Sequence, residues 1–310
     1  MIFFFAPVQG HTDAAYRHFH TRLYGNNLTY VTPFIRLEKN ELRPRDLRDY
    51  KSDLNSNLHV IPQIIFRNRE ELLRLTELMM EADAKEIDLN MGCPFPLQTG
   101  HGRGAATIGN IDLAENIKNL ADNNPEISFS VKMRLGMKDP SEWRKIMPVL
   151  NEARLSHIVM HPRVAAIQYN GQPDLEEFAK FHEESKNPVI YNGDLTSPSE
   201  IASIIGQFPG LKGIMIGRGL LRRPSLIQEF ISGTELNPEE RIKKMLEFHN
   251  ELYQYYASVL CGDSQVISKI QPFWEYAEEE IGRKSWKAIK KASSLAKYQT
   301  AIATIHNSLI

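Results

Sequence analysis

The chain has 310 residues, 42% of them hydrophobic, and its 37 basic residues nearly balance its 38 acidic ones. This length and composition suit one large domain with or without a smaller companion, and they give no general attraction to nucleic acid or anionic membranes. Any site for a polyanion must therefore be local.

The two cysteines, Cys93 and Cys261, lie too far apart in sequence to indicate a disulfide framework, so we expect free thiols in a reducing cytoplasm. The N-terminal apolar run MIFFFAP covers seven residues and continues into the polar QGHTD. It fits neither a signal peptide nor a membrane span. We expect it to form the first strand.

Short apolar runs rich in Val, Ile and Phe recur along the first 219 residues and predict strands. Segments with helical spacing lie between most of them, such as residues 69–84 and 112–124. Eight alternations of strand and helix predict a (β/α)8 TIM barrel, an α/β fold. The predicted strands are residues 2–8, 28–34, 59–65, 86–92, 129–135, 157–163, 188–194 and 213–219.

Only helical patterns follow the eighth strand. A last barrel helix is predicted to stop at Gly233, and Asn237, Pro238 and Glu240 then form a strong helix start as N-cap, first helical residue and capping-box partner. Residues 241–310 carry 10 basic and 7 acidic residues, which makes this part locally basic. We predict a barrel domain over residues 1–234 and a small all-helical domain over residues 235–310.

Each predicted strand ends in Pro, Gly or a polar residue. In a barrel all these ends surround one mouth, where active sites of this fold lie. Residues scattered over about two hundred positions are therefore expected to become neighbours, among them Pro7, Gln63, Asn90, Cys93, Lys132, Arg134, His161, Asn192, Gly193, Gly217 and Arg218.

The loops after the last two predicted strands suggest a phosphate site. Gly193, Gly217 and Gly219 would let backbone N–H groups approach a ligand, and Arg218 adds a charged donor. The alternative is that these glycines only make tight turns. Two adjacent loops of this kind favour phosphate binding.

Three side chains facing that site suit a flavin. Gln63 offers an amide, His161 a donor, and Lys132 a cation that would stabilise the negative charge of the reduced ring. Alternatives remain open from the residues alone: Lys132 as a Schiff-base lysine or a surface residue, and His161 as a structural histidine.

Cys93 lies just beyond the fourth predicted strand, between Gly92, which allows a tight turn, and Pro94, which fixes φ. A thiol with an ordinary pKa of about 8.5 is mostly protonated at neutral pH and can act as a general acid. The alternative is a buried, inert cysteine. We assign that inert role to Cys261.

Together these residues resemble the tRNA-dihydrouridine synthases. The resemblance covers the whole barrel in the right order, and the segment around Cys93 is its most specific part. The motifs are APVQGHTDAAYR (6–17), PQI (62–64), IDLNMGCPFPLQTGHGRGAATI (87–108), SVKMRLG (130–136), HPRVAAIQYNGQPD (161–174), YNGD (191–194) and MIGRG (215–219).

The resemblance implies an enzyme that reduces a uridine of tRNA with NADPH through FMN. Hydride would pass from the reduced flavin to C6 of the uracil, and Cys93 would protonate C5. Asn90 and Arg134 would hold the edge of the base and Tyr169 would pack against it. The residues implied in FMN binding are Pro7, Gln63, Lys132, His161, Asn192, Gly193, Gly217 and Arg218.

The helical domain is similar in size and placement to the tRNA-binding domain of these enzymes. Its segment VISKIQPFWEYAEEE resembles the bacterial group that includes the U16-modifying enzyme. Lys284, Lys287 and Lys291 follow helical spacing and could contact the RNA backbone, although such a stripe is often only a solvated helix face.

Three rival functions remain open at this point: an FMN-dependent reductase of a small molecule, a lyase that uses Lys132 as a Schiff base, and a non-catalytic tRNA-binding protein. We expect no metal site, no membrane contact and no obligate protein partner. The sequence does not select the modified uridine.

Overall fold

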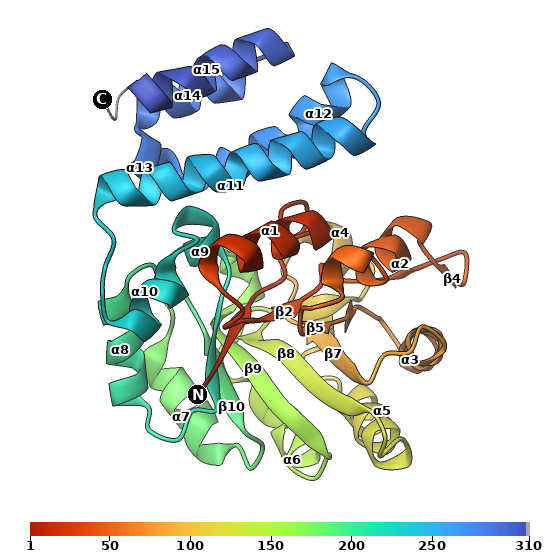
Figure 1. Cartoon of the computed structure of the whole chain (residues 1–310). Helices are drawn as coiled ribbons and strands as arrows, with labels where there is room; N and C mark the ends of the chain where they lie inside the picture. The colour runs from red at the N-terminus through yellow and green to blue at the C-terminus, as the bar shows by residue number, and fades with distance from the viewer. Residues whose placement is uncertain (308–310) are drawn as a thin grey trace.

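The structure, a computed structural model, describes residues 1–307 and contains a parallel barrel (Figure 1). Neighbouring strands follow the order β5-β2-β1-β11-β10-β9-β8-β7-β6, and every pairing within this sheet is parallel. Each predicted apolar run contains strand, so the predicted TIM barrel is confirmed. The strands are β1 (Ile2–Phe5), β2 (Thr29–Val31), β5 (Val60–Ile61), β6 (Gln63–Ile64), β7 (Glu86–Met91), β8 (Ser128–Gly136), β9 (Leu155–Val164), β10 (Val189–Asn192) and β11 (Gly213–Ile216).

The third predicted strand is divided into β5 and β6 at Pro62. Proline has no N–H to donate to a neighbouring strand, but its carbonyl still accepts a hydrogen bond from the Asp88 backbone at 2.9 Å. β5 pairs with β2, and β6 pairs with β7. The two pieces therefore act as one interrupted strand that closes the barrel.

Helices surround the barrel, and side-chain N-caps fix where several of them begin. Asn68 caps α3, and Asp83 with φ +63° ends the predicted helix 69–84 slightly early. The helices of this part are α1 (Ala14–Tyr24), α2 (Pro44–Tyr50), α3 (Arg69–Glu81), α4 (Pro96–Thr99), α5 (Ile111–Asn123), α6 (Met147–Leu150), α7 (Leu175–Glu184), α8 (Pro198–Gln207), α9 (Arg218–Arg222) and α10 (Leu226–Ser232). A hairpin of β3 (Leu37–Glu38) and β4 (Glu41–Leu42) lies outside the barrel.

The rest of the described chain is helical, as predicted. Gly233 ends α10 in the left-handed conformation, and Asn237 and Glu240 form the expected capping box. Residues 308–310 of the predicted domain lie outside the described residues. The helices are α11 (Pro238–Val259), α12 (Asp263–Ile270), α13 (Glu278–Ile281), α14 (Arg283–Lys291) and α15 (Leu295–Asn307).

The C-terminal helices pack on the barrel through α11, which lies across α1 (Figure 1). The rings of Tyr16 and Phe248 meet edge to face at 4.8 Å, and the Tyr256 hydroxyl donates to the Asp13 carboxylate. Lys269 pairs with the same carboxylate at 2.6 Å. Buried residues of both parts belong to one apolar cluster, so the boundary at residue 234 stays a prediction.

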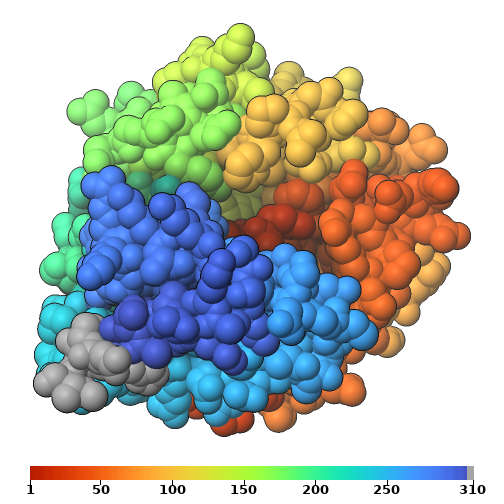
Figure 2. Space-filling model, turned by 90° about the horizontal axis from the view of Figure 1, so that it is seen from above, coloured from red at the N-terminus to blue at the C-terminus, as the bar shows by residue number. Residues whose placement is uncertain are grey.

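A separate apolar cluster fills the barrel interior. It joins side chains from β1, β2, β5, β9, β10 and β11, namely Phe4, Ala6, Val31, Ile61, Val159, Ile190 and Met215. Filled interiors are typical of this fold. Chemistry is therefore confined to the mouth, where Figure 2 shows a hollow bordered by the C-terminal helices and by barrel loops.

Candidate active site

Strand register aligns polar residues of β6, β7 and β8 at two successive levels below and at the mouth. Gln63 is paired with Asp88, and Asp88 with Ser130. One pleat further toward the mouth, Asn90 is paired with Lys132. Since residues two apart on a strand share a face, these side chains form a continuous polar surface across β6, β7 and β8.

Cys93 is held by the backbone around it. Its N–H donates to the Asn90 side-chain oxygen at 2.9 Å, and its carbonyl accepts from Ala105 at 3.0 Å. Gly104 has φ +60°, and a Cβ atom at that position would lie 2.7 Å from the Cys93 carbonyl oxygen and 2.8 Å from its Cβ. Only glycine fits there, so the Cys93 side chain has a fixed place at the mouth.

The Cys93 thiol is only 8% exposed, and burial raises its pKa. A hydrogen bond from the Phe95 backbone and the charges of Arg134 and Lys132 oppose this rise without cancelling it. The thiol is therefore protonated at neutral pH. It is suited to donate a proton rather than to attack as a nucleophile.

A chain of hydrogen bonds runs from Cys93 into the barrel. The Asn90 oxygen accepts from Cys93 and Gly92, and its amide nitrogen donates to the Gln63 oxygen at 2.7 Å. The Gln63 nitrogen then donates to Asp88 at 2.6 Å, and the Ser130 hydroxyl donates to the other Asp88 oxygen at 2.6 Å. Asp88 was assigned no role from the sequence. A carboxylate within an apolar run was nevertheless a signal of a buried polar interaction.

Lys132 is a half-buried cation on β8. Its ammonium group makes no hydrogen bond or ion pair with any other residue that the structure describes. Burial and then the charge of Arg134 lower its pKa to about 8, whereas Asp88 and Cys93 raise it. An unpaired cation beside the mouth suits the edge of a flavin that becomes negative on reduction.

His161 is neutral and offers one N–H group. Its Nε2 atom lies 3.0 Å from the Arg163 guanidinium. Because arginine can only donate, Nε2 accepts and the proton sits on Nδ1. Burial, followed by the charges of Arg134 and Lys132, lowers the His161 pKa far below its ordinary value, which keeps the ring uncharged.

Tyr169 lies between two guanidinium groups at the rim. Arg218 is 4.2 Å and Arg134 is 5.2 Å from the centre of its ring. Arg134 also donates to the carbonyl oxygens of Val164 and Gln168, which fixes the loop that carries Tyr169. Tyr169 is 40% exposed, so the two arginines hold a partly accessible aromatic ring at the edge of the hollow.

Asp194 links two arginines from different elements, Arg163 on β9 and Arg218 on α9. It pairs with Arg218 at 2.5 Å and with the buried Arg163. Burial raises the Asp194 pKa, but the bonds to the two arginines outweigh this effect and hold the pKa below its ordinary value. Neither Arg163, which the sequence places at a strand end of the mouth, nor Asp194 was assigned a role from the sequence, although each lies within two residues of a predicted site residue.

The predicted FMN-binding residues Pro7, Gly193 and Gly217 follow three adjacent strands, β1, β10 and β11. The Asn192 amide donates to the Met215 carbonyl at 2.8 Å. A Cβ atom at Gly217 would lie 3.3 Å from Ala6. At Gly193 it would collide with the Tyr191 hydroxyl, so packing explains this glycine, and its contact with phosphate stays a prediction.

A family model described as dihydrouridine synthase (Dus) matches residues 4–308. The chain belongs to the dihydrouridine synthase family. The protein named tRNA-dihydrouridine synthase B from Pasteurella multocida (strain Pm70) is 27% identical over 266 residues, which are 82% of this chain and 78% of the relative. The protein of the same name from Escherichia coli (strain K12) is 25% identical over 242 residues, which are 74% of each chain.

A solved structure of a variant of NCR from Zymomonas mobilis shares the fold, with a TM-score of 0.51 and 13% identity over 76% of this chain and 87% of that one. The resemblance inferred from the motifs is thus confirmed, and the chain is a flavin-dependent oxidoreductase that forms dihydrouridine. This excludes the lyase and the non-catalytic alternatives. The assignment to the U16 group stays a prediction.

In this dihydrouridine synthase the rim of the mouth carries exposed apolar residues. Phe95 is 46% and Leu97 is 80% exposed. Ile167 and Tyr169, on the loop after β9, are exposed as well. The rings of Phe95 and Tyr169 lie 6.4 Å apart. These four residues, the apolar rim, begin two positions after Cys93.

The predicted RNA-backbone contacts Lys284, Lys287 and Lys291, here named the α14 lysines, lie outside the mouth on helix α14. All three are exposed, and α14 contains no acidic residue. The nearby glutamates are engaged elsewhere, since Glu279 pairs with Arg222, and Glu280 pairs with Arg241 at 3.1 Å. The positive charge of α14 is therefore not neutralised by its own neighbours.

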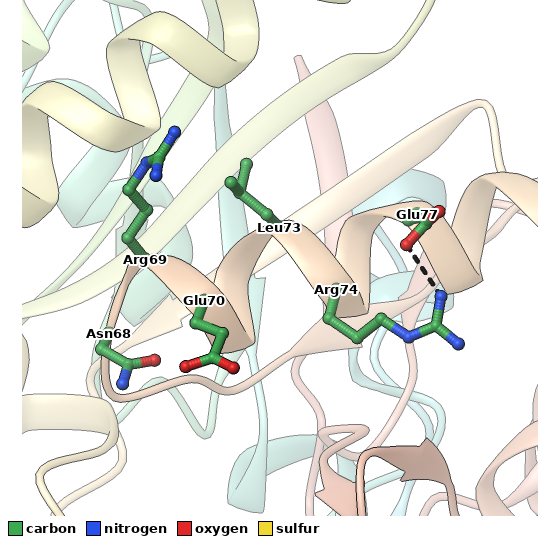
Figure 3. A pocket seen from close by; sticks show the side chains of 6 residues that line it. All are labelled: Asn68, Arg69, Glu70, Leu73, Arg74 and Glu77. Atoms are coloured by element: carbon green, nitrogen blue, oxygen red, sulfur yellow. Dashed lines mark hydrogen bonds and ion pairs between the residues drawn. The ribbon is translucent and has the colours of Figure 1, made fainter.

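Two further concave surfaces are lined by residues outside the predicted site. One lies along the outer face of α3 and contains an Arg74–Glu77 ion pair at 2.7 Å (Figure 3). Another, of about 630 Å³, lies between α11 and α15. In the described part of the chain no cluster of His, Cys, Asp or Glu could hold a metal ion, and no helix is long and apolar enough to cross a membrane.

Proposed function

We propose that this protein reduces a uridine of tRNA to dihydrouridine, with FMN as the bound flavin and Cys93 as the acid. The observation that carries this proposal is the placement of a protonated thiol and an unpaired cation, Lys132, at one barrel mouth. Saturating the C5–C6 bond of uracil requires a hydride and a proton. When bound, reduced FMN would supply the hydride to C6, and Cys93 would supply the proton to C5.

Eight residues would hold the FMN. Lys132 would neutralise the negative edge of the reduced ring, and the Nδ1–H group of His161 would donate to the ring system. Arg218 and the turns at Gly193 and Gly217 would bind the phosphate. Pro7, Gln63 and Asn192 complete the set.

Asn90, Arg134 and Tyr169 would hold the uracil. One amide hydrogen of Asn90 is used by Gln63, which leaves the second for a carbonyl of the base. The pKa of Arg134 is lowered to about 10 by burial, so Arg134 is still charged at neutral pH and can donate to the same edge. An extruded base needs such partners on its edge and an aromatic surface on its face, which Tyr169 provides.

The surroundings of Cys93 suit a single proton transfer. Burial keeps the thiol protonated until substrate is present, and the charges of Arg134 and Lys132 favour the thiolate left afterwards. Solvent must then return a proton before the next turnover.

A large polyanionic substrate fits the surface around the mouth. The apolar rim offers faces on which unpaired bases can stack, and the α14 lysines offer charges for backbone phosphates. As further proposals, drawn from the family resemblance, NADPH reduces the flavin and the protein acts in the cytoplasm.

The test is position-by-position analysis of dihydrouridine in tRNA from a strain lacking the gene. Loss at one position, restored by the wild-type gene and not by Cys93→Ala, is expected. Unchanged dihydrouridine at every site in a strain with no second such enzyme would contradict the proposal. With purified protein, Cys93→Ala should keep reduction of its flavin by NADPH while product formation falls steeply.

A further inference from the structure

Asp88 is a buried carboxylate that the proposed chemistry does not use. Its side chain is almost inaccessible to solvent, and its neighbours along β7 are the buried apolar residues Ile87 and Leu89. Burial raises its pKa, while hydrogen bonds from Ser130 and Gln63 and the charge of Lys132 oppose the rise. A buried carboxylate is costly unless its oxygens accept hydrogen bonds, so its presence needs an explanation.

The two ends of the hydrogen-bond chain determine its direction. The backbone N–H groups of Gly92 and Cys93 can only donate, so the Asn90 side chain must turn its oxygen toward them and its amide nitrogen toward Gln63. The Gln63 side-chain oxygen must then accept from Asn90, and its nitrogen must donate to the next residue. That residue has to be a hydrogen-bond acceptor, and it is Asp88.

We propose that Asp88 is a positioning residue that fixes the orientation of the Gln63 and Asn90 amides and, through Asn90, the place of the Cys93 thiol. Its catalytic consequence depends on the proposed role of Cys93 as the acid. The positioning itself does not depend on it. It can be measured on the thiol without tRNA.

The two amides lie between a fixed acceptor and two fixed donors, so reversing them breaks hydrogen bonds at both ends. Ser130 completes the arrangement by donating to the second oxygen of Asp88, so that neither oxygen is left unsatisfied. An apolar residue at position 88 would leave the Gln63 nitrogen buried and unpaired.

A pair of substitutions tests the direction of the chain. Asn90→Asp replaces the N–H donor that faces Gln63 with an acceptor. Gln63 then lies between two carboxylates, at positions 88 and 90, and in either orientation of its amide the oxygen faces one of them. Adding Asp88→Asn reverses the two hydrogen bonds made by Gln63: the new amide donates to Gln63, and Gln63 donates to the carboxylate at position 90. That carboxylate still accepts from the Cys93 N–H, so every hydrogen bond of the chain is restored.

The readout is the rate at which iodoacetamide alkylates Cys93 at pH 9 in the purified full-length protein. All proteins carry Cys261→Ser, because Cys261 is exposed and would react as well. Asp88→Asn alone should stay within about threefold of the parent, since its amide oxygen can accept from Gln63 and its nitrogen can donate to Ser130. Asn90→Asp should change the rate on the order of tenfold, and the double variant should return it to within about threefold of the parent.

Equal rates in Asn90→Asp and in the double variant would overturn the proposal, because a simple loss of packing cannot be repaired by a second change of charge. An unchanged rate in Asn90→Asp would overturn it as well. If Asn90→Asp does not accumulate as folded protein, recovery of folded protein in the double variant tests the same pairing, and its absence counts against the proposal. None of these outcomes depends on turnover of tRNA, so failure here is distinct from failure of the proposed function.

Discussion

Gly104→Ala should disturb the Cys93 thiol through a direct collision. Gly104 has φ +60°, and the added Cβ atom would lie 2.7 Å from the Cys93 carbonyl oxygen, 2.8 Å from the Cys93 Cβ and 3.1 Å from the Cys93 nitrogen. A left-handed conformation costs an alanine about 1–2 kcal/mol. Overpacking of this kind adds about 1–3 kcal/mol.

Gly102→Ala is the matched control. Gly102 lies on the same loop with φ +73°, but the nearest atom to its added Cβ is the Arg67 Cβ at a comfortable 3.7 Å. This variant incurs the left-handed cost of about 1–2 kcal/mol without a collision. The difference between the two variants therefore isolates the contact with Cys93.

Urea unfolding and single-turnover kinetics measure the two consequences. We expect Gly104→Ala to be less stable than Gly102→Ala by about 1–3 kcal/mol, or to relieve the collision by moving Cys93. A displacement near 1 Å reduces product formation on the order of a hundredfold, while reduction of the flavin by NADPH is retained. If the two variants match in both stability and product formation, the inferred fit between Gly104 and Cys93 is wrong.

Three further predictions concern Lys132, the α14 lysines and the apolar rim. Because the pKa of Lys132 is lowered to about 8, its charge destabilises the fold at neutral pH. In denaturation curves, Lys132→Met should raise the free energy of unfolding by about 1–3 kcal/mol at pH 7, and most of this gain should disappear by pH 10, where wild-type Lys132 is deprotonated. In FMN titrations the same variant should bind FMN more weakly. Replacing the α14 lysines with alanine should lower tRNA affinity and reduce the slope of log K against log salt by about 2–3, whereas replacing Lys85 and Lys186, which precede strands at the opposite end of the barrel, should leave the slope unchanged. Leu97→Ser should raise KM for tRNA on the order of fivefold to tenfold without slowing flavin reduction, and Ile231→Ser, at a 50% exposed position on α10, should do neither.

The barrel could be predicted because its signals are local. Each strand is an apolar run bounded by Gly, Pro or polar residues, and the capping box at Asn237 and Glu240 occurs in the structure as the sequence indicates. The mouth followed from topology, because parallel strands carry their ends to one place. Pro62 divided the third strand without breaking the barrel, since its carbonyl still pairs with β7.

The hydrogen-bond partners could not be predicted in the same way. Arg163 and Asp194 come from different strand ends, and no periodicity in either segment indicates that they pair. Asn90 was correctly placed at the mouth, but the sequence could not show that its oxygen already serves the backbone of Gly92 and Cys93. Such pairings depend on strand register and on side-chain direction, which appear only when the sheet is assembled.

Two opposed requirements meet at Cys93, and different elements satisfy them. A general acid must hold its proton before the reaction, which burial beneath the loop from Phe95 to Ala105 achieves. It must also release that proton once, which requires nearby positive charge, and Arg134 and Lys132 on β8 provide it. Because one element controls burial and another controls charge, substitutions on the loop should alter access to the thiol, whereas substitutions on β8 should alter its acidity. A pH profile of Cys93 alkylation separates the two effects: loop variants change the limiting rate, and β8 variants shift the midpoint toward higher pH.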